Sequence, residues 1–206
     1  MSTNSSAGVH NHRDDEAQKM GMWFFLFTEL LLFGGLFLVY SIYRFKNPEA
    51  FAHGAKELNV VLGTINTIIL LTSSLTVALS ITAIQKGQKK LALGLVLFTI
   101  FCALLFLVNK YFEWGHKFEI GIYPGSELLR AIPPGEALFF VLYYFMTGLH
   151  AIHVIVGAII LAFMARYIHT GFINSNYFVL LENGALYWHL VDLIWIFLFP
   201  LLYLIH

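Results

Sequence analysis

Five long apolar stretches constrain this 206-residue chain more than any other feature of its sequence. They lie at about 21–43, 58–84, 91–114, 135–166 and 183–205. A helix needs about 20 mostly apolar residues to cross the hydrocarbon core of a bilayer. Because lipid offers the backbone no hydrogen-bond partners, each stretch must satisfy its own backbone as a helix. We therefore predict an all-α integral membrane protein, a bundle of five transmembrane helices.

The composition agrees with this assignment and excludes some other classes of protein. Hydrophobic residues make up 59% of the chain and charged residues 12%, whereas soluble domains average about 25% charged residues. The formal net charge is zero, so the chain lacks the basic surface that would indicate a nucleic-acid partner. Its one cysteine, Cys102, lies within the third stretch and is expected to be a buried thiol.

The polar segments outside the spans are short. Residues 1–19 are polar and are predicted to form a flexible tail, which leaves 20–206 as the membrane domain. The sequence Pro133-Pro134-Gly135 should end any helix just before the fourth span. Lysine and arginine divide six against six between the two sides of the membrane, so the positive-inside rule does not choose an orientation.

Glu29 is an ionisable residue near the middle of the first span. It lies eight residues after Gly21, or about 12 Å along a helix. No basic residue in its own span can pair with it, and ionisable groups in hydrocarbon usually face protein or water. Two interpretations stay open: a neutral carboxyl group that donates one hydrogen bond between helices, or a group that handles protons or contacts another subunit.

Further polar residues recur at helical spacing in the later spans. Pairs three residues apart share one face of a helix, and neutral imidazole and carboxylate are natural hydrogen-bond partners. We therefore predict an interhelical polar network that ties the fifth span to the third and fourth. Its members are Glu113, which follows Lys110 by one turn, and His150, His153, His189 and Asp192.

Three alternatives use the same residues differently. His153 and His189 could ligate haem from two helices, or three histidines and Glu113 could hold a metal ion. A transporter could use Glu29 and Asp192 as proton carriers. The sequence shows no nucleophile with its base and no phosphate-binding loop, so the chain by itself is expected to be non-catalytic and to hold no metal.

Small and hydroxylated residues mark faces where helices are expected to approach closely and to form hydrogen bonds across the contact. In the second span these are Asn66, Thr67, Thr72, Ser73, Ser74 and Thr76, and elsewhere Gly34, Gly35, Gly148 and Gly157. Aromatic residues near span ends suit the membrane interface, namely Trp23, Trp114, Tyr187 and Trp188.

Several motifs, taken together, resemble subunit III of the haem-copper respiratory oxidases, the cytochrome c oxidase subunit III family. They are WFFLFTELLLFGG (23–35), NTIILLTSSLTVA (66–78), KYFEW (110–114), FFVLYYFMTGLHAIHVIVG (139–157) and YWHLVDLIWIFLF (187–199). Larger members have seven helices in a V that holds lipid. This chain lacks an equivalent of the first two helices and resembles the short five-helix bacterial form. Bound phospholipid is a further candidate ligand.

The resemblance implies a non-catalytic subunit of an aerobic, proton-pumping terminal oxidase of the cytochrome c oxidase type. Haem and copper would lie in subunit I, which this chain would stabilise while supporting proton uptake; subunit II and smaller subunits would be further partners. Glu29 matches the family's buried glutamate at the lipid cleft, and the five network residues match its polar positions. An accessory subunit of nitric oxide reductase and a haem b membrane anchor are the alternatives.

The resemblance also implies a location and an orientation. The chain would be a multi-pass protein of the bacterial inner membrane, with its N-terminus in the cytoplasm and its C-terminus in the periplasm or outside the cell.

Overall fold

The computed structural model describes residues 6–205, and its regular structure is helical apart from one isolated bridge between Asn174 and Tyr177. The predicted all-α fold with five long apolar helices is confirmed. The helices are α1 (Ser6–Lys46), α2 (Pro48–Lys56), α3 (Val60–Gln85), α4 (Lys89–Ile120), α5 (Glu127–Ala131), α6 (Pro134–Thr170) and α7 (Val179–Tyr203).

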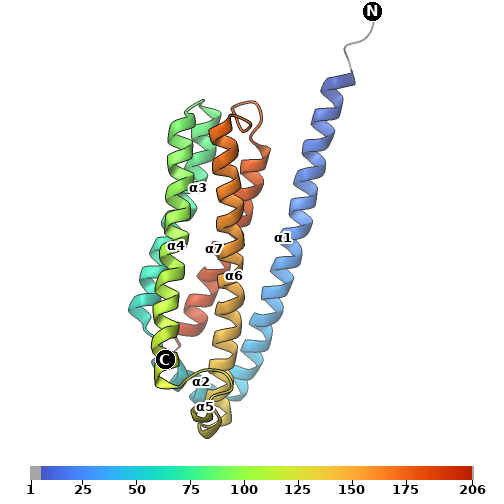
Figure 1. The fold of residues 1–206 in the computed structure, drawn as a ribbon. Helices are drawn as coiled ribbons and strands as arrows, with labels where there is room; N and C mark the ends of the chain where they lie inside the picture. The colour runs from blue at the N-terminus through green and yellow to red at the C-terminus, as the bar shows by residue number, and fades with distance from the viewer. Residues whose placement is uncertain (1–5, 206) are drawn as a thin grey trace, which may run out of the picture.

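Two short helices, α2 and α5, lie in connectors where no helix was predicted. Proline at the start of α2 costs no hydrogen bond, because the first backbone N–H groups of a helix have no partner within it. The Ser126 hydroxyl caps α5 by accepting a hydrogen bond from the backbone N–H of Leu129 at 3.1 Å. Both helices lie at the end of the molecule opposite the beginning of α1 (Figure 1).

Helix α1 begins inside the segment that was predicted to be a tail. The structure describes residues 6–19 as the start of this helix, and residues 1–5 lie outside the described residues. The predicted first span is therefore the later part of a longer helix. The flexibility of residues 1–19 and the boundary of the membrane domain at residue 20 stay predictions.

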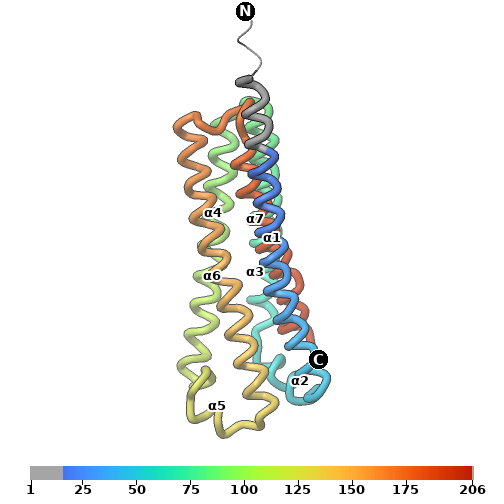
Figure 2. The backbone as a smooth tube through the Cα atoms, turned by 90° about the vertical axis from the view of Figure 1, so that its right-hand side faces the viewer, coloured from blue at the N-terminus to red at the C-terminus, as the bar shows by residue number. Residues whose placement is uncertain are grey.

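Helices α3, α4, α6 and α7 form a four-helix bundle, in which α3 contacts α4 and α7 while α6 contacts the same two helices. Helix α1 stands at one side and runs obliquely to the bundle, with α7 as its main neighbour (Figures 1 and 2). Only 11% of the most apolar 18-residue stretch of α1 is buried, whereas 33–50% of the corresponding stretch is buried in the other long helices. Most of the apolar surface of α1 is therefore left for lipid or another protein.

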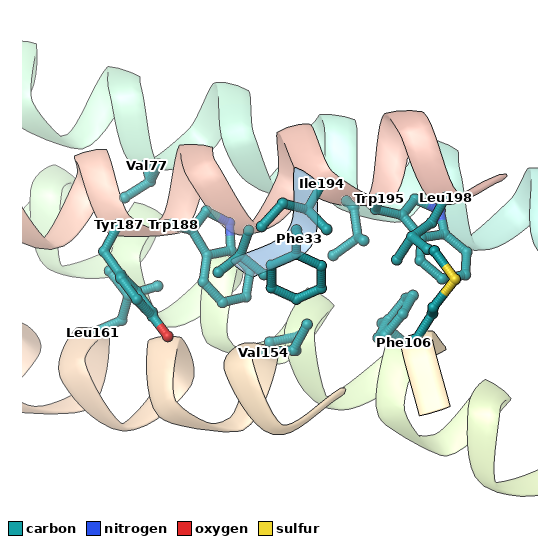
Figure 3. Close-up of a cluster of buried hydrophobic side chains, with 14 of the residues drawn as sticks. Phe33, Val77, Phe106, Val154, Leu161, Tyr187, Trp188, Ile194, Trp195 and Leu198 are labelled. Atoms are coloured by element: carbon teal, nitrogen blue, oxygen red, sulfur yellow. The ribbon is translucent and has the colours of Figure 1, made fainter. Parts of the chain in front are cut away.

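Helix α7 supplies the centre of the hydrophobic core (Figure 3). Trp195 lies against Phe106 of α4, with ring centroids 4.9 Å apart. Tyr187 and Trp188 are also buried, at 2% and 0% exposure, so the prediction that they lie in an interfacial belt is wrong. Trp23, in contrast, is exposed on α1.

Glycine permits the closest approach between α6 and α7. A Cβ atom at Gly157 would lie 2.8 Å from the Trp188 ring, so the prediction of a close helix contact there is confirmed. A Cβ atom at Gly34 or Gly35 would meet nothing within 4 Å, so within the described chain these two glycines do not serve a close contact.

We predict that Gly157→Ala lowers the free energy of unfolding by about 1–3 kcal/mol, because overpacking forces the Trp188 ring to move. The matched control is Gly94→Ala on α4, where the added methyl group meets nothing within 4 Å. Alanine is the better helix former by about 0.5–1 kcal/mol, so the control should be neutral or stabilising. Thermal unfolding of the purified chain in detergent measures both, and equal melting temperatures would contradict the packing described.

Candidate functional site

Hydrogen bonds from α7 to α3 satisfy polar groups deep in the bundle. The indole N–H of Trp188 donates to the Ser73 hydroxyl and that of Trp195 to the Thr67 hydroxyl, each at 3.0 Å. His189 Nδ1 lies 2.7 Å from the hydroxyl oxygen of Ser74. The predicted packing face of the second span is thus confirmed for these α3 residues.

Two predictions made from the sequence are wrong, one about the partner of His189 and one about Thr72. His189 was expected to bond to the third or fourth span, but its partner is on α3, the second. Thr72 is exposed, and its hydroxyl donates to the carbonyl oxygen of Ile68 in its own helix at 2.8 Å.

Glu113 lies at the centre of a buried charged cluster formed by α4, α6 and α7. One carboxyl oxygen accepts hydrogen bonds from the hydroxyl groups of Tyr143 and Tyr203, at 2.7 and 2.5 Å. The other accepts from the Lys110 ammonium group at 3.0 Å. The ammonium group also donates to the Tyr203 oxygen and lies 5.0 Å from the centre of the Trp195 ring system. Two opposite charges that are 5% exposed or less are thus held by a full set of partners.

Glu29 and His153 form a second centre, which connects α1 to α6. Glu29 Oε2 lies 2.7 Å from His153 Nε2, and His153 Nδ1 lies 2.7 Å from the carbonyl oxygen of Leu149. A carbonyl oxygen only accepts, so Nδ1 must carry a proton. The contact at Nε2 then holds one further proton, which belongs either to a neutral carboxyl group or to a charged imidazolium. The geometry therefore places a single shared proton between the two helices.

His150 and Asp192 are buried without such partners. The His150 ring lies between Phe106 and Trp195, at centroid distances of 5.5 and 5.2 Å, and neither ring nitrogen forms a hydrogen bond with the described residues. Neither Asp192 oxygen has a hydrogen bond of normal geometry from the described residues, although the Ser74 hydroxyl lies close by.

The five residues predicted to form one network therefore lie in separate places. No hydrogen bond connects any two of Glu113, His150, His153, His189 and Asp192. Their functional roles stay predictions. Lys110 was visible in the sequence from its spacing to Glu113, but nothing in the sequence indicates which tyrosines face inward.

The alternatives with a metal or haem gain no support from these contacts. Both ring nitrogens of His153 are occupied by protein oxygens, and one nitrogen of His189 is occupied by Ser74. Among the side chains that the structure describes, those of residues 16–205, no three histidine, cysteine or carboxylate groups lie close enough together to hold a metal ion.

We predict that Lys110→Met and Glu113→Leu each lower the free energy of unfolding by about 3–5 kcal/mol, because each leaves a buried charge without its partner. The double variant should lose much less than the sum. The more solvent-accessible pair Lys19 and Glu182, whose side chains are 51% and 28% exposed and whose nitrogen–oxygen distance is 3.4 Å, is the control and should contribute less than about 1 kcal/mol. Unfolding in detergent measures the free energies of the two single variants and of the double variant. Additive losses at Lys110 and Glu113 would refute their coupling.

We predict that Glu29→Leu detaches the middle of α1 from α6, because few other contacts hold the two helices together. Glu29→Gln should keep them together, since an amide N–H can donate to Nε2. Thr28→Val is the control, because the Thr28 hydroxyl bonds only to its own helix, at 2.7 Å from the Phe25 carbonyl oxygen. Distances between spin labels on α1 and α6 measure the effect, and an unbroadened distribution in Glu29→Leu would contradict it.

Comparison with known proteins gives a consistent result over the whole chain. The family model described as cytochrome c oxidase subunit III matches residues 1–206. Cytochrome c oxidase subunit 3 of Synechocystis sp. is 32% identical over 96% of this chain and 79% of its own length. Cytochrome bo(3) ubiquinol oxidase subunit 3 of Buchnera aphidicola is 29% identical over 89% of this chain and 92% of its own length.

A relative from Aeropyrum pernix, heme-copper oxidase subunit I+III, is 32% identical over 91% of this chain. The matched part makes up 22% of that relative, so this chain spans less than a quarter of it. The full-length family match, the five apolar helices and the motifs agree. The chain belongs to the cytochrome c oxidase subunit III family, the non-catalytic third subunits of haem-copper oxidases.

Proposed function

We propose that this chain is the accessory subunit III of a proton-pumping terminal oxidase and that it packs against subunit I, which would carry the haem and copper. The Aeropyrum pernix relative carries this proposal, because it is named as subunit I and subunit III together in one protein. Covalent fusion of two subunits suggests that they also associate where they are separate chains. The relatives described above are all named as oxidases, which supports oxygen as the substrate of the complex.

The surface of the chain suits such an assembly. Helix α1 is long and apolar yet little buried, and it carries large exposed side chains such as Trp23, Phe24 and Phe27. Subunit I, with subunit II, smaller subunits and membrane lipid, including bound phospholipid, would cover this surface. The role of the chain is then to stabilise subunit I during turnover and to support its proton uptake.

Glu29 is the residue that we assign to a proton-linked role at the α1–α6 contact. The side chains of Glu29 and His153 are 15% and 13% exposed, so the shared proton lies between α1 and the bundle and is not fully enclosed by this chain. Glu113, His150, His189 and Asp192 are assigned to the polar interior that fixes the helices. No residue of this chain is assigned to catalysis.

We further propose that the chain lies in a bacterial inner membrane. If all five long apolar helices cross the membrane, the two ends of the chain lie on opposite sides of it, and the five candidate spans support this arrangement. An N-terminus in the cytoplasm and a C-terminus in the periplasm or outside the cell is the arrangement expected from the family resemblance.

Affinity purification of the native complex through a tag on this chain tests the proposal. We expect an oxidase subunit I to co-purify, with its haem spectrum. A complex purified from a strain lacking this chain should keep that spectrum but lose activity several times faster during turnover, because subunit I is no longer supported. Co-purification without a haem protein, or a haem absorption band that stays with this chain after it is separated from its partners, would refute the proposal.

A further inference from the structure

A cavity with several polar side chains in its lining opens at the end of the bundle where the described part of α1 begins. It has a volume of about 400 Å³ and lies between α1, α3 and α7. Lys19, Glu182, Asn183 and His189 are among the side chains that line it. A water molecule takes up about 30 Å³ of liquid, so the cavity has room for several. It also has the polar groups that water needs, including the Asn183 side-chain oxygen, which forms no hydrogen bond with the described residues.

His189 connects this cavity to the interior of the bundle. The imidazole lines the cavity, and its Nδ1 lies 2.7 Å from the Ser74 hydroxyl oxygen. The same hydroxyl group lies close to the carboxyl group of Asp192, one turn further along α7. Asp192 is ten residues beyond Glu182, or about 15 Å deeper along the helix.

Asp192, at the inner end of this series of polar groups, is a buried carboxyl group without a partner of its own among the described residues. It is 3% exposed, and its oxygens have no hydrogen bond of normal geometry from the described residues. The ionisable group that faces it from another helix is Cys102 on α4, and no charged side chain among the described residues balances its charge. A carboxylate left alone in hydrocarbon is costly, and a proton from the cavity would remove that cost.

We propose that the cavity is the opening of a proton path, and that His189 and Ser74 carry protons between it and Asp192. A hydronium ion in the cavity gives a proton to Nε2 of His189, while Nδ1–H gives its proton to the Ser74 oxygen. Ser74 passes its own hydroxyl proton to Asp192. One water molecule, the other imidazole tautomer and a neutral carboxyl group result, and the reverse steps release the proton. The path gives the proposed role in proton uptake a route through named residues. Its biological purpose therefore rests on that proposed function.

Infrared difference spectroscopy of the intact complex tests the path. As the pH falls, we expect a band of a protonated carboxyl group to grow in the unaltered complex and to be missing in Asp192→Asn. In deuterium oxide, Ser74→Ala should slow the isotope shift of this band at least tenfold. The control is Thr72→Val, which removes an exposed hydroxyl from the same helix and should leave the exchange unchanged.

The outcomes separate this path from the broader function. A band that does not depend on pH or on Asp192, or an equally fast exchange in Ser74→Ala, would overturn the path. If the band and its exchange behave as expected but Asp192→Asn pumps protons and turns over normally, the path stands and the proposed support of proton uptake fails.

Discussion

The tryptophan N–H groups of α7 are the constraint on which much of this bundle depends. A polar group without a partner in hydrocarbon costs several kcal/mol, and no water is available there to satisfy it. Trp188 and Trp195 meet this requirement through hydroxyl groups on α3, about two helical turns apart. Two such bonds fix the rotation and the depth of α7 together. The same placement brings His189 to Ser74 and Tyr203, at the far end of the helix, to Glu113.

The charged cluster around Glu113 and the contact between Glu29 and His153 also give polar groups in the membrane their partners. They differ in how deeply they are buried. Lys110 and Glu113 lie inside the four-helix bundle, where opposite charges and two tyrosine hydroxyls satisfy one another completely. Glu29 lies on the least buried helix and shares a single proton with His153. The first arrangement holds three helices in one register, whereas the second is the hydrogen-bonded link between α1 and α6. Helix α1 is also held to α7, where the Tyr40 hydroxyl donates to the carbonyl oxygen of Leu201 at 2.6 Å.

The sequence predicted the spans well, because the thickness of the hydrocarbon core determines how long an apolar run must be. It also revealed the face of α3, because hydroxylated residues inside a membrane need a reason to be there. It did not identify partners: that His189 would meet Ser74 depends on which helices are neighbours, which periodicity does not encode. Tyr187 and Trp188 were placed at the interface because of their residue type, but in the structure they pack in the core, where Gly157 leaves room for Trp188. The short helices α2 and α5 were not predicted, because they are too short to show a helical periodicity of apolar residues.

The separation of the polar centres has a consequence for proton movement. If Asp192 takes up protons from the N-terminal end, a continuous row of hydrogen bonds from it to the Glu113 cluster would allow protons to leak across the membrane. The described residues form no such row. His150 lies between Phe106 and Trp195, with no hydrogen bond at either ring nitrogen, and Trp195 also packs against Lys110. This aromatic layer separates the two centres. A path that ends at Asp192 can therefore store a proton without conducting it across the membrane.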